Sequence, residues 1–386
     1  MKSRILFAPK DAWLPFCLIA ALFLATLTLW VPAYWPVAAF EMGVYLFAGA
    51  AIVLGKQPAQ GAAYPLVVLS SIALWGVLQL LTGSSVNRFV TERAILQWMT
   101  WAAVYYLGVS TLKEQNLARL VRVAIVWFGF VIAVEAILQA YLSPGKVFGL
   151  FDTGYQNFVM GPIVYHTHFA VFIESILPIA LLLAFESYTY LGIAAVLLTA
   201  VVVSASRGGM IIAFAEVLVV LLLSQRQKQK ILRSALALAG VTALLILLVG
   251  LTTASQRFHA EALTVGRAQF ARSTLHMIAA HPLIGWGLGC WPTVYPAFAT
   301  FDPGALVNQA HTDWLQWTAE GGLPVGLAML SLAIWAGKPA IRSIWGIGVI
   351  AVLIHAAFDY PFSRPAVGAW PFLILAMAAV ARPTQG

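Results

Sequence analysis

The stretch that decides the fold is residues 189–233, which read TYLGIAAVLLTAVVVSASRGGMIIAFAEVLVVLLLSQRQKQKILR. Two apolar runs, 189–204 and 209–224, meet at Ser206-Arg207-Gly208-Gly209, and a basic segment, 226–233, follows them. Two apolar helices joined by so tight a glycine turn form a hairpin with its tip at a membrane interface. The basic segment marks the cytoplasmic end, because short cytoplasmic loops carry an excess of Lys and Arg. We therefore predict a helical hairpin inside a membrane.

The composition of the whole chain also indicates a membrane protein. Of its 386 residues 61% are hydrophobic and only 9% are charged, and the mean hydropathy is +0.89. A soluble chain carries roughly 25% charged residues. The net charge of +8 would suggest a nucleic-acid partner in a soluble protein. Here the basic residues fall mainly in short loops between apolar runs, so they indicate membrane orientation and no nucleic acid.

We expect an all-α fold, a single membrane domain over residues 1–386 with about twelve spans and no soluble domain before or after them. An N-terminus in the cytoplasm places 14 of the 22 Lys and Arg residues inside and 8 outside. The inside segments are shorter, so the density bias is roughly fourfold and both termini are predicted to be cytoplasmic. The predicted spans are 13–30, 36–54, 63–82, 94–111, 120–142, 163–184, 189–204, 209–224, 234–253, 322–336, 343–358 and 366–381.

This topology makes residues 254–321, between the ninth and tenth spans, one long extracytoplasmic loop. A loop of this length is usually functional or disordered, and its many aromatic residues and two helical patterns argue against disorder. The first predicted helix runs from Gly266-Arg267 through Ala280. Arg267 heads its apolar face, where an arginine either snorkels to the interface or holds an anion. The second runs from about Asn308, as N-cap, to Glu320, with Gly321-Gly322 as its stop.

All seven histidines map to the predicted outer half of the chain, which points the active face outward. They are His166, His168, His259, His276, His281, His311 and His355. The alternative explanation is that histidine simply prefers interfaces to bilayer interiors. His311 falls on the second loop helix, on one face with Trp314, Leu315 and Thr318, and a lone histidine there is often structural.

Three arginines accompany the histidines: Arg207 at the hairpin tip, and Arg267 and Arg272 on the first loop helix. Guanidinium forks bind a pyrophosphate bidentately and stabilise its charge as a sugar–phosphate bond breaks, without needing a metal. A neutral histidine can accept the proton of an attacking sugar hydroxyl. Each arginine could instead be an interface anchor.

Three glutamates, Glu135, Glu174 and Glu216, lie within predicted spans at a similar depth. Ionisable groups at membrane depth are functional candidates. They would either line the floor of one polar cavity or pack as protonated side chains.

Four segments in a fixed order carry a family resemblance. They are Gly161–Ala170 followed by Glu174 and Pro178; Ser206–Gly209; Gly266-Arg267 with His281–Gly289; and Ala310–Gln316 followed by Glu320 and Gly322. Together with a weaker pattern at His355, Asp359 and Pro361, they resemble the O-antigen ligase family over residues 160–365. That family includes O-antigen polymerases and bacterial O-linked protein glycosyltransferases. The chain departs from the family pattern at Tyr165, Thr167 and Thr312, where asparagine is usual.

The resemblance implies a membrane glycosyltransferase without cofactor or metal. It would transfer glycan, with inversion, from undecaprenyl pyrophosphate to an acceptor sugar at the periplasmic face of the bacterial inner membrane. By the resemblance, His311 is the catalytic base and Arg207 and Arg267 hold the pyrophosphate. We assign six further residues to substrate binding: Arg272 of the first loop helix, and the motif residues His166, His168, His281, Asp313 and Glu174.

The acceptor is the sugar of lipid A–core in a ligase, or the end of another lipid-linked repeat in an O-antigen or exopolysaccharide polymerase. We favour the ligase. Family members that glycosylate proteins usually carry a further C-terminal domain, which we do not expect here. The rival class is a twelve-span secondary transporter, which often shows internal repeats around a midplane site, and no repeat is visible. A lipid-binding scaffold without chemistry would keep the arginines but have no use for His311.

Overall fold

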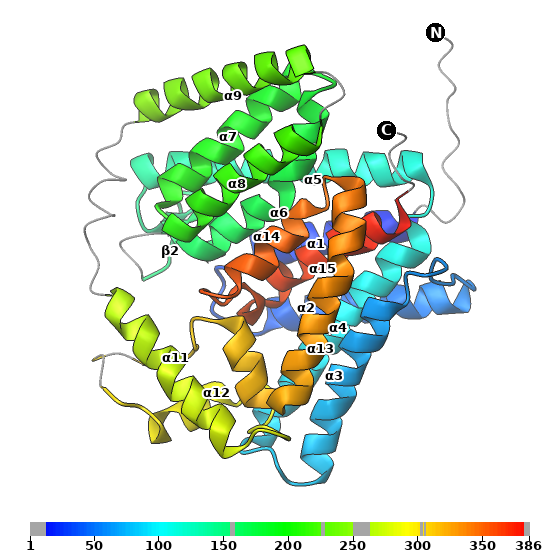
Figure 1. Ribbon diagram of the computed structural model, residues 1–386, viewed down its shortest axis with the longest axis vertical. Coiled ribbons are helices and arrows are strands. Elements are labelled where there is room, and N and C mark those ends of the chain that lie inside the picture. The colour runs from blue at the N-terminus through cyan, green and yellow to red at the C-terminus, as the bar shows by residue number, and fades with distance from the viewer. Residues whose placement is uncertain are drawn as a thin grey trace.

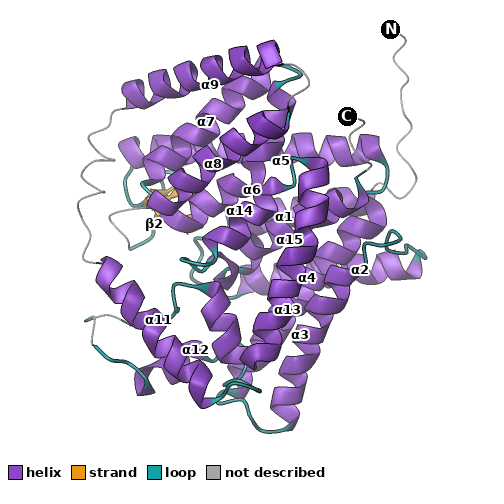
Figure 2. Ribbon diagram, in the orientation of Figure 1, coloured by secondary structure: helices purple, strands orange, loops and turns teal. Residues whose placement is uncertain are grey.

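The computed structural model describes residues 13–154, 159–224, 228–249, 263–301, 304 and 306–381, and these are mainly helical (Figures 1 and 2). Each predicted span overlaps a helix. In chain order the helices are α1 (Trp13–Leu27), α2 (Trp35–Val53), α3 (Tyr64–Leu81), α4 (Arg88–Thr111), α5 (Gln115–Leu142), α6 (His166–Ala184), α7 (Tyr188–Ser204), α8 (Arg207–Leu223), α9 (Lys228–Val249), α11 (Leu263–Ala280), α12 (Trp291–Val294), α13 (Asp313–Ser343), α14 (Ile347–His355) and α15 (Pro365–Val380). Arg226 and His259 lie outside the described residues.

Short strands and 3-10 turns connect α5 to α6. Strand β1 (Lys146–Val147) pairs antiparallel with β2 (Phe151–Asp152), and β3 (Val159–Met160) pairs with β4 (Val164–Tyr165) around η1 (Gly161–Ile163). Two further 3-10 turns are η3 (Tyr295–Ala297) and η4 (Pro361–Ser363). Because each strand has only two residues, the prediction of a helical fold is confirmed.

Five of the described helices are long and apolar enough to cross a membrane: α2, α3, α5, α6 and α13. Shorter apolar helices include α1, α7 and α15. The membrane class is therefore supported, while the number of twelve spans stays a prediction. Helix α14 differs from the predicted span 343–358, because its 9 residues measure only about 14 Å against a hydrocarbon core of about 30 Å.

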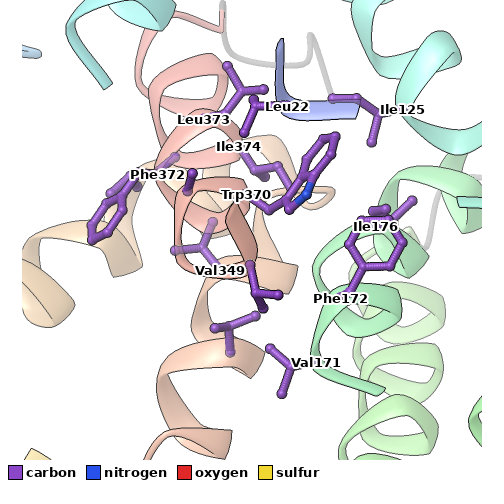
Figure 3. Packing of buried hydrophobic residues seen from close by; sticks show 14 of the residues in the cluster. Leu22, Ile125, Val171, Phe172, Ile176, Val349, Trp370, Phe372, Leu373 and Ile374 are labelled. Atoms are coloured by element: carbon purple, nitrogen blue, oxygen red, sulfur yellow. The ribbon is translucent and has the colours of Figure 1, made fainter. Parts of the chain in front are cut away.

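Helix α6 is the centre of the bundle, with 94% of its apolar stretch buried. It contacts α5, α7, α8, α14 and α15. Being apolar around most of its circumference, it has no face to offer to water. Figure 3 shows Trp370 of α15 next to Phe172 of α6; their ring centroids are 5.5 Å apart, and the Trp370 indole donates to Thr26 at 3.0 Å.

Helices α11 and α12 form a separate layer at one end of the bundle, beside the start of α13 (Figure 1). The glycine-rich turn after α11 interlocks with a break in α13 at Gly322, whose φ is +73°. A Cβ on Gly285 would lie within 2.5 Å of the Gly322 nitrogen, so the two backbones touch. Leu323 N–H donates to Pro282 O at 2.8 Å. The predicted helix stop at Gly321-Gly322 is thus a break, after which the helix resumes.

Gln79 of α3 connects the layer of α11, α12 and the glycine-rich turn, called the outer layer below, to the bundle. Its side-chain amide donates to Ile284 O at 2.6 Å and to Glu320 O at 2.8 Å, and its carbonyl accepts from Leu288 N–H at 3.0 Å. All three partners belong to the interlocked turn or to the end of the first half of α13. The outer layer therefore has a fixed position on the bundle.

The second loop helix was predicted to start near Asn308, and this is wrong. Helix α13 begins at Asp313 with Thr312 as its N-cap residue, so His311 lies in the preceding loop. The reason is tertiary: the Asp313 N–H donates to Ala356 O at 2.9 Å and to Asp359 O at 3.1 Å. These contacts with the α14–α15 connection take the donor that a longer helix would use internally.

Candidate functional site

Five helix termini meet at one end of the bundle. Helices α6, α8, α13 and α15 begin there, and α14 ends there at His355. Gly209 of α8 lies against Ala170 of α6, with a Cβ built on it 2.6 Å from the Ala170 Cβ, and Gly208 lies against Phe358. Helices that cross a membrane in alternating directions begin or end at the same face in this way. It gathers four of the motif segments at a single face.

His311 sits in an aromatic slot with a strained backbone. Its ring stacks on Phe270 of α11, with centroids 5.5 Å apart, and meets the edge of Tyr360 at 4.7 Å. Its φ is +56°, a left-handed conformation that is uncommon outside glycine and concentrates at functional sites. Its Nδ1 is buried and has no hydrogen-bond partner among the described residues. The ring is thus held by packing while a nitrogen stays available.

The surroundings of His311 keep its imidazole neutral. Burial lowers the pKa of His311 to about 4, the Asp359 carboxylate acts in the opposite direction, and the Arg267 guanidinium lowers the pKa further. At neutral pH the ring therefore carries no charge. A neutral imidazole is the form that accepts a proton.

Asp359 is the carboxylate at the centre of the cluster. Burial alone would raise the pKa of Asp359, but His168, His355, Thr167 and Arg267 together hold that pKa below its usual value. Asp359 is therefore an anion at neutral pH. His355 faces it at 3.8 Å between Nε2 and Oδ2.

Glu174 lies behind His355 and not at the surface of the site. It is fully buried, and both of its oxygens lie 2.9 Å from His355 Nδ1. Glu174, His355 and Asp359 thus form a line of three buried groups that leads from α6 to the His311 loop. Assigned to substrate binding from the sequence, Glu174 is placed by the structure to orient His355.

His168 and His166 open α6 beside the same cluster. His168 is 1% exposed, and its ring lies between Tyr165 at 4.7 Å and Tyr360 at 4.8 Å. Neither of its ring nitrogens has a hydrogen-bond partner among the described residues. His166 is half-buried next to Tyr165, at 5.4 Å. Val164, the residue before Tyr165, has a φ of +66°, a marked outlier for a β-branched side chain.

The three predicted arginines lie in different positions relative to His311. Arg267 lies three residues before Phe270 on α11, hence on nearly the same face, and its charge acts on His311 and Asp359. Arg207 is exposed at the start of α8, next to the Gly208–Phe358 contact. Arg272 is exposed and lies two residues beyond Phe270, about 200° around the helix, so it points away from His311.

His281 and Asp313, also predicted to bind substrate, occupy structural positions. His281 is exposed and directly follows α11, about 17 Å along the helix axis from Phe270, and its ring lies at a tilt against Trp286, with centroids 4.0 Å apart. The Asp313 side chain is buried and accepts from Phe362 N–H at 3.1 Å. The structure therefore brings Arg267, His168 and His311 together around Asp359, with His166 near His168 at the start of α6, and leaves Arg272 and His281 apart.

The three membrane glutamates do not line one floor. Glu135 accepts from Phe148 N–H, in the β1–β2 hairpin, at 3.1 Å. Glu216 of α8 is buried and lies close enough to Glu174 for their charges to interact. Within the described residues, no group of three or more His, Cys, Asp or Glu side chains is arranged to hold a metal ion.

The fold and the cluster define a polytopic helical membrane protein with histidines, arginines and one carboxylate gathered at a single face. Comparison with known families gives a match to the O-antigen ligase family over residues 192–330. This match confirms the resemblance to the O-antigen ligase family seen in the sequence. No curated protein matches the chain significantly.

Sequence reasoning gave no role to Phe270, His355, Asp359 or Tyr360. The spacing of His355 and Asp359, four residues apart at the end of a span, was a usable signal, because one further helical turn after α14 brings the two groups to the same side, with the Asp359 N–H donating to His355 O at 3.0 Å. The aromatic slot had no signal, since Phe270 is separated from its partner by 41 residues of sequence.

Proposed function

We propose that this protein is a ligase-type glycosyltransferase of the bacterial inner membrane, with both termini in the cytoplasm and its site in the periplasm. It transfers glycan from undecaprenyl pyrophosphate to a sugar of lipid A–core. The family supports a glycosyltransferase of the ligase or polymerase type. The basic bias of the loops and the convergence of motif segments at one face support the orientation.

The chemistry needs one base and one binding site for the leaving group. The acceptor hydroxyl oxygen attacks the anomeric carbon of the donor sugar while the bond from that carbon to the pyrophosphate oxygen breaks. His311 takes the hydroxyl proton, and the pyrophosphate leaves with the bonding electron pair. Attack opposite the leaving group inverts the anomeric configuration, and no metal is required in this scheme.

Arg207 and Arg267 receive the charge that the pyrophosphate gains. Guanidinium groups bind phosphate oxygens through two parallel hydrogen bonds, and they stabilise the charge that grows in the transition state. Arg267 lies on the His311 side of α11, and Arg207 at the tip of the α7–α8 hairpin, beside Phe358. A donor between these two elements would have its anomeric carbon near the His311 slot.

Asp359 stabilises the imidazolium that forms when His311 takes the proton. This is the role of the third group in nucleophile–base–carboxylate arrangements. Glu174 holds His355, whose Nε2 faces Asp359 Oδ2 at 3.8 Å. Asp359 is thus a positioning residue that acts through His311.

The observation that carries the proposal is the neutral, strained and partly unpartnered His311 beside Arg267 and Asp359. The test is glycan transfer by purified protein in lipid vesicles, with donor binding measured separately. His311→Ala should bind donor normally and transfer roughly 10²- to 10⁴-fold more slowly. His276→Ala, which changes an exposed histidine on α11, is the matched control and should transfer normally. A His311→Ala protein that transfers at the normal rate would contradict the proposal.

A further inference from the structure

A second feature of the described structure lies at the connection from η4 to α15, a few residues after Tyr360 in the chain. A cavity of about 370 Å³ opens between the turn that joins α1 to α2, the first half of α4 and the start of α15. This volume is in the range of small-ligand sites. None of the predicted site residues lines it.

The walls of the cavity are mainly apolar, with the polar side chains of Thr28, Tyr34, Gln97 and Ser363 and one charged side chain among them. Leu29, Val31, Val37 and Phe40 are among the lining residues, and Arg364 is the only charged one. Arg364 is exposed and makes no ion pair with the described residues. An apolar pocket with one cation at its rim suits a molecule with a hydrocarbon part and an anionic group.

The position of the cavity suits a lipid in the outer leaflet. Tyr34 and Trp35, in the α1–α2 turn, are 47% and 63% exposed, as expected of aromatic side chains at the level of lipid headgroups. The Arg93 guanidinium lies over the ring of Tyr34, a lining residue, at 2.9 Å from its centroid, which adds positive charge at the same level. A phosphate in the cavity would meet Arg364, while Arg93 adds positive charge next to Tyr34 without lining the cavity.

The cavity adjoins the reaction site without overlapping the donor side. Burial raises the pKa of the Tyr360 hydroxyl and the Arg364 guanidinium counteracts this, so Arg364 lies within electrostatic range of Tyr360. Gln97 of α4, which lines the cavity, donates to Phe362 O at 2.7 Å and so fixes the wall next to Tyr360. Arg207 and Arg267 belong to α8 and α11, and neither helix contributes to the cavity.

We infer that this cavity binds the phosphate-bearing glycolipid acceptor, with an acyl chain among the apolar walls and a phosphate at Arg364. The inference rests on the proposed function, because a transferase that joins two lipid-anchored substrates must hold them on two sides of one centre. The acceptor sugar would then approach His311 past Tyr360. The donor would approach from α8 and α11.

The test is lipid retention by the purified full-length protein in detergent, measured by native mass spectrometry. The probes are lipid A, undecaprenyl pyrophosphate and phosphatidylglycerol. Arg364→Gln should weaken lipid A binding roughly tenfold and leave undecaprenyl pyrophosphate binding unchanged. Val37→Phe, which fills the cavity without altering charge, should also weaken lipid A binding. Arg88→Gln removes an exposed charge of α4 that pairs with Glu92, away from the lining, and should change nothing.

Three results would overturn the inference. The first is a wild-type protein that retains no lipid A. The second is an equal loss of phosphatidylglycerol and lipid A in Arg364→Gln, which would indicate a general contact with anionic lipid. The third is a loss of undecaprenyl pyrophosphate in place of lipid A. These binding results are independent of transfer, so selective lipid A binding in a protein without transferase activity would refute the proposed function and leave the cavity assignment standing.

Discussion

Two buried carboxylates, Glu320 and Asp359, lie in the same end of the molecule and differ in how many hydrogen bonds they accept. Glu320 accepts from Gly289 N–H at 2.9 Å, from Trp291 N–H at 3.3 Å and from the Gln316 amide at 3.0 Å. Asp359 accepts from Tyr360 N–H at 2.9 Å through Oδ1, and its Oδ2 is buried without a hydrogen-bond partner in the described structure.

The number of hydrogen bonds distinguishes a carboxylate with a structural role from one that can take part in catalysis. A carboxylate with several backbone donors holds a turn together, because removing it leaves each donor buried and unpaired. Asp359 has one oxygen without a hydrogen-bond partner, and both ring nitrogens of the neighbouring His168 also lack a partner among the described residues, so the cluster is poorly satisfied in the resting protein. Such groups persist where a substrate or a moving proton completes them. The glycine turn around Glu320 is therefore scaffold, and the Asp359 cluster is the candidate centre.

Of the changes that test this comparison, the largest effect is expected at Asp359. Asp359→Asn keeps the oxygen that accepts from Tyr360 but removes the negative charge, so transfer should fall about 100-fold. The loss should appear in kcat with an unchanged KM, and Asp359→Glu should restore part of it. A merely structural Asp359 would instead lower the thermal stability and leave kcat per folded molecule intact.

The matched variant at the other carboxylate, Glu320→Gln, should behave in the reverse way. It turns an acceptor oxygen into an amide that faces backbone donors, at a cost of roughly 1–3 kcal/mol for each donor left unpaired. Thermal unfolding in detergent should therefore occur at a lower temperature, while the folded fraction transfers glycan normally. Equal activity losses at Glu320 and Asp359 would remove the distinction between them.

A smaller effect sharpens the division among the arginines. Arg267→Lys keeps the charge but loses the guanidinium fork, so transfer should fall about tenfold. Arg272→Lys, on the same helix but facing away from His311, should have no effect in the same vesicle assay. If the two variants behave alike, α11 carries only interface anchors.

The smallest expected effect is that of pH on the transfer rate near neutrality. Because burial lowers the pKa of His311 to about 4, the ring stays neutral at every higher pH. Transfer should therefore be constant from about pH 5 to 8 and fall as the pH approaches 4, where the base becomes protonated. A profile of transfer rate against pH checks this, and a midpoint near the ordinary histidine value of about 6.5 would contradict the buried slot.

The sequence predicted the helices and the hairpin tip because their signals are local. Ser206 caps α8 by accepting from Gly209 N–H at 3.1 Å, within the quoted motif. The start of α13 was mispredicted because its first donor is taken by Ala356 and Asp359, more than 40 residues away. The site shows the same limit. Its histidines and arginines were recognisable as residue types, whereas the separation of Arg267 from Arg272 depends on which face of α11 meets His311.

The pairing of Glu174 with His355 also has a consequence for how the protein is made. The two residues are 181 positions apart, so α6 is synthesised long before its partner on α14 exists. An ionisable side chain in the bilayer is costly until it is paired or enclosed by other helices. Glu174 of the central helix is therefore paired only after α14 has inserted, so α6 enters the bilayer before its buried carboxyl group has a partner.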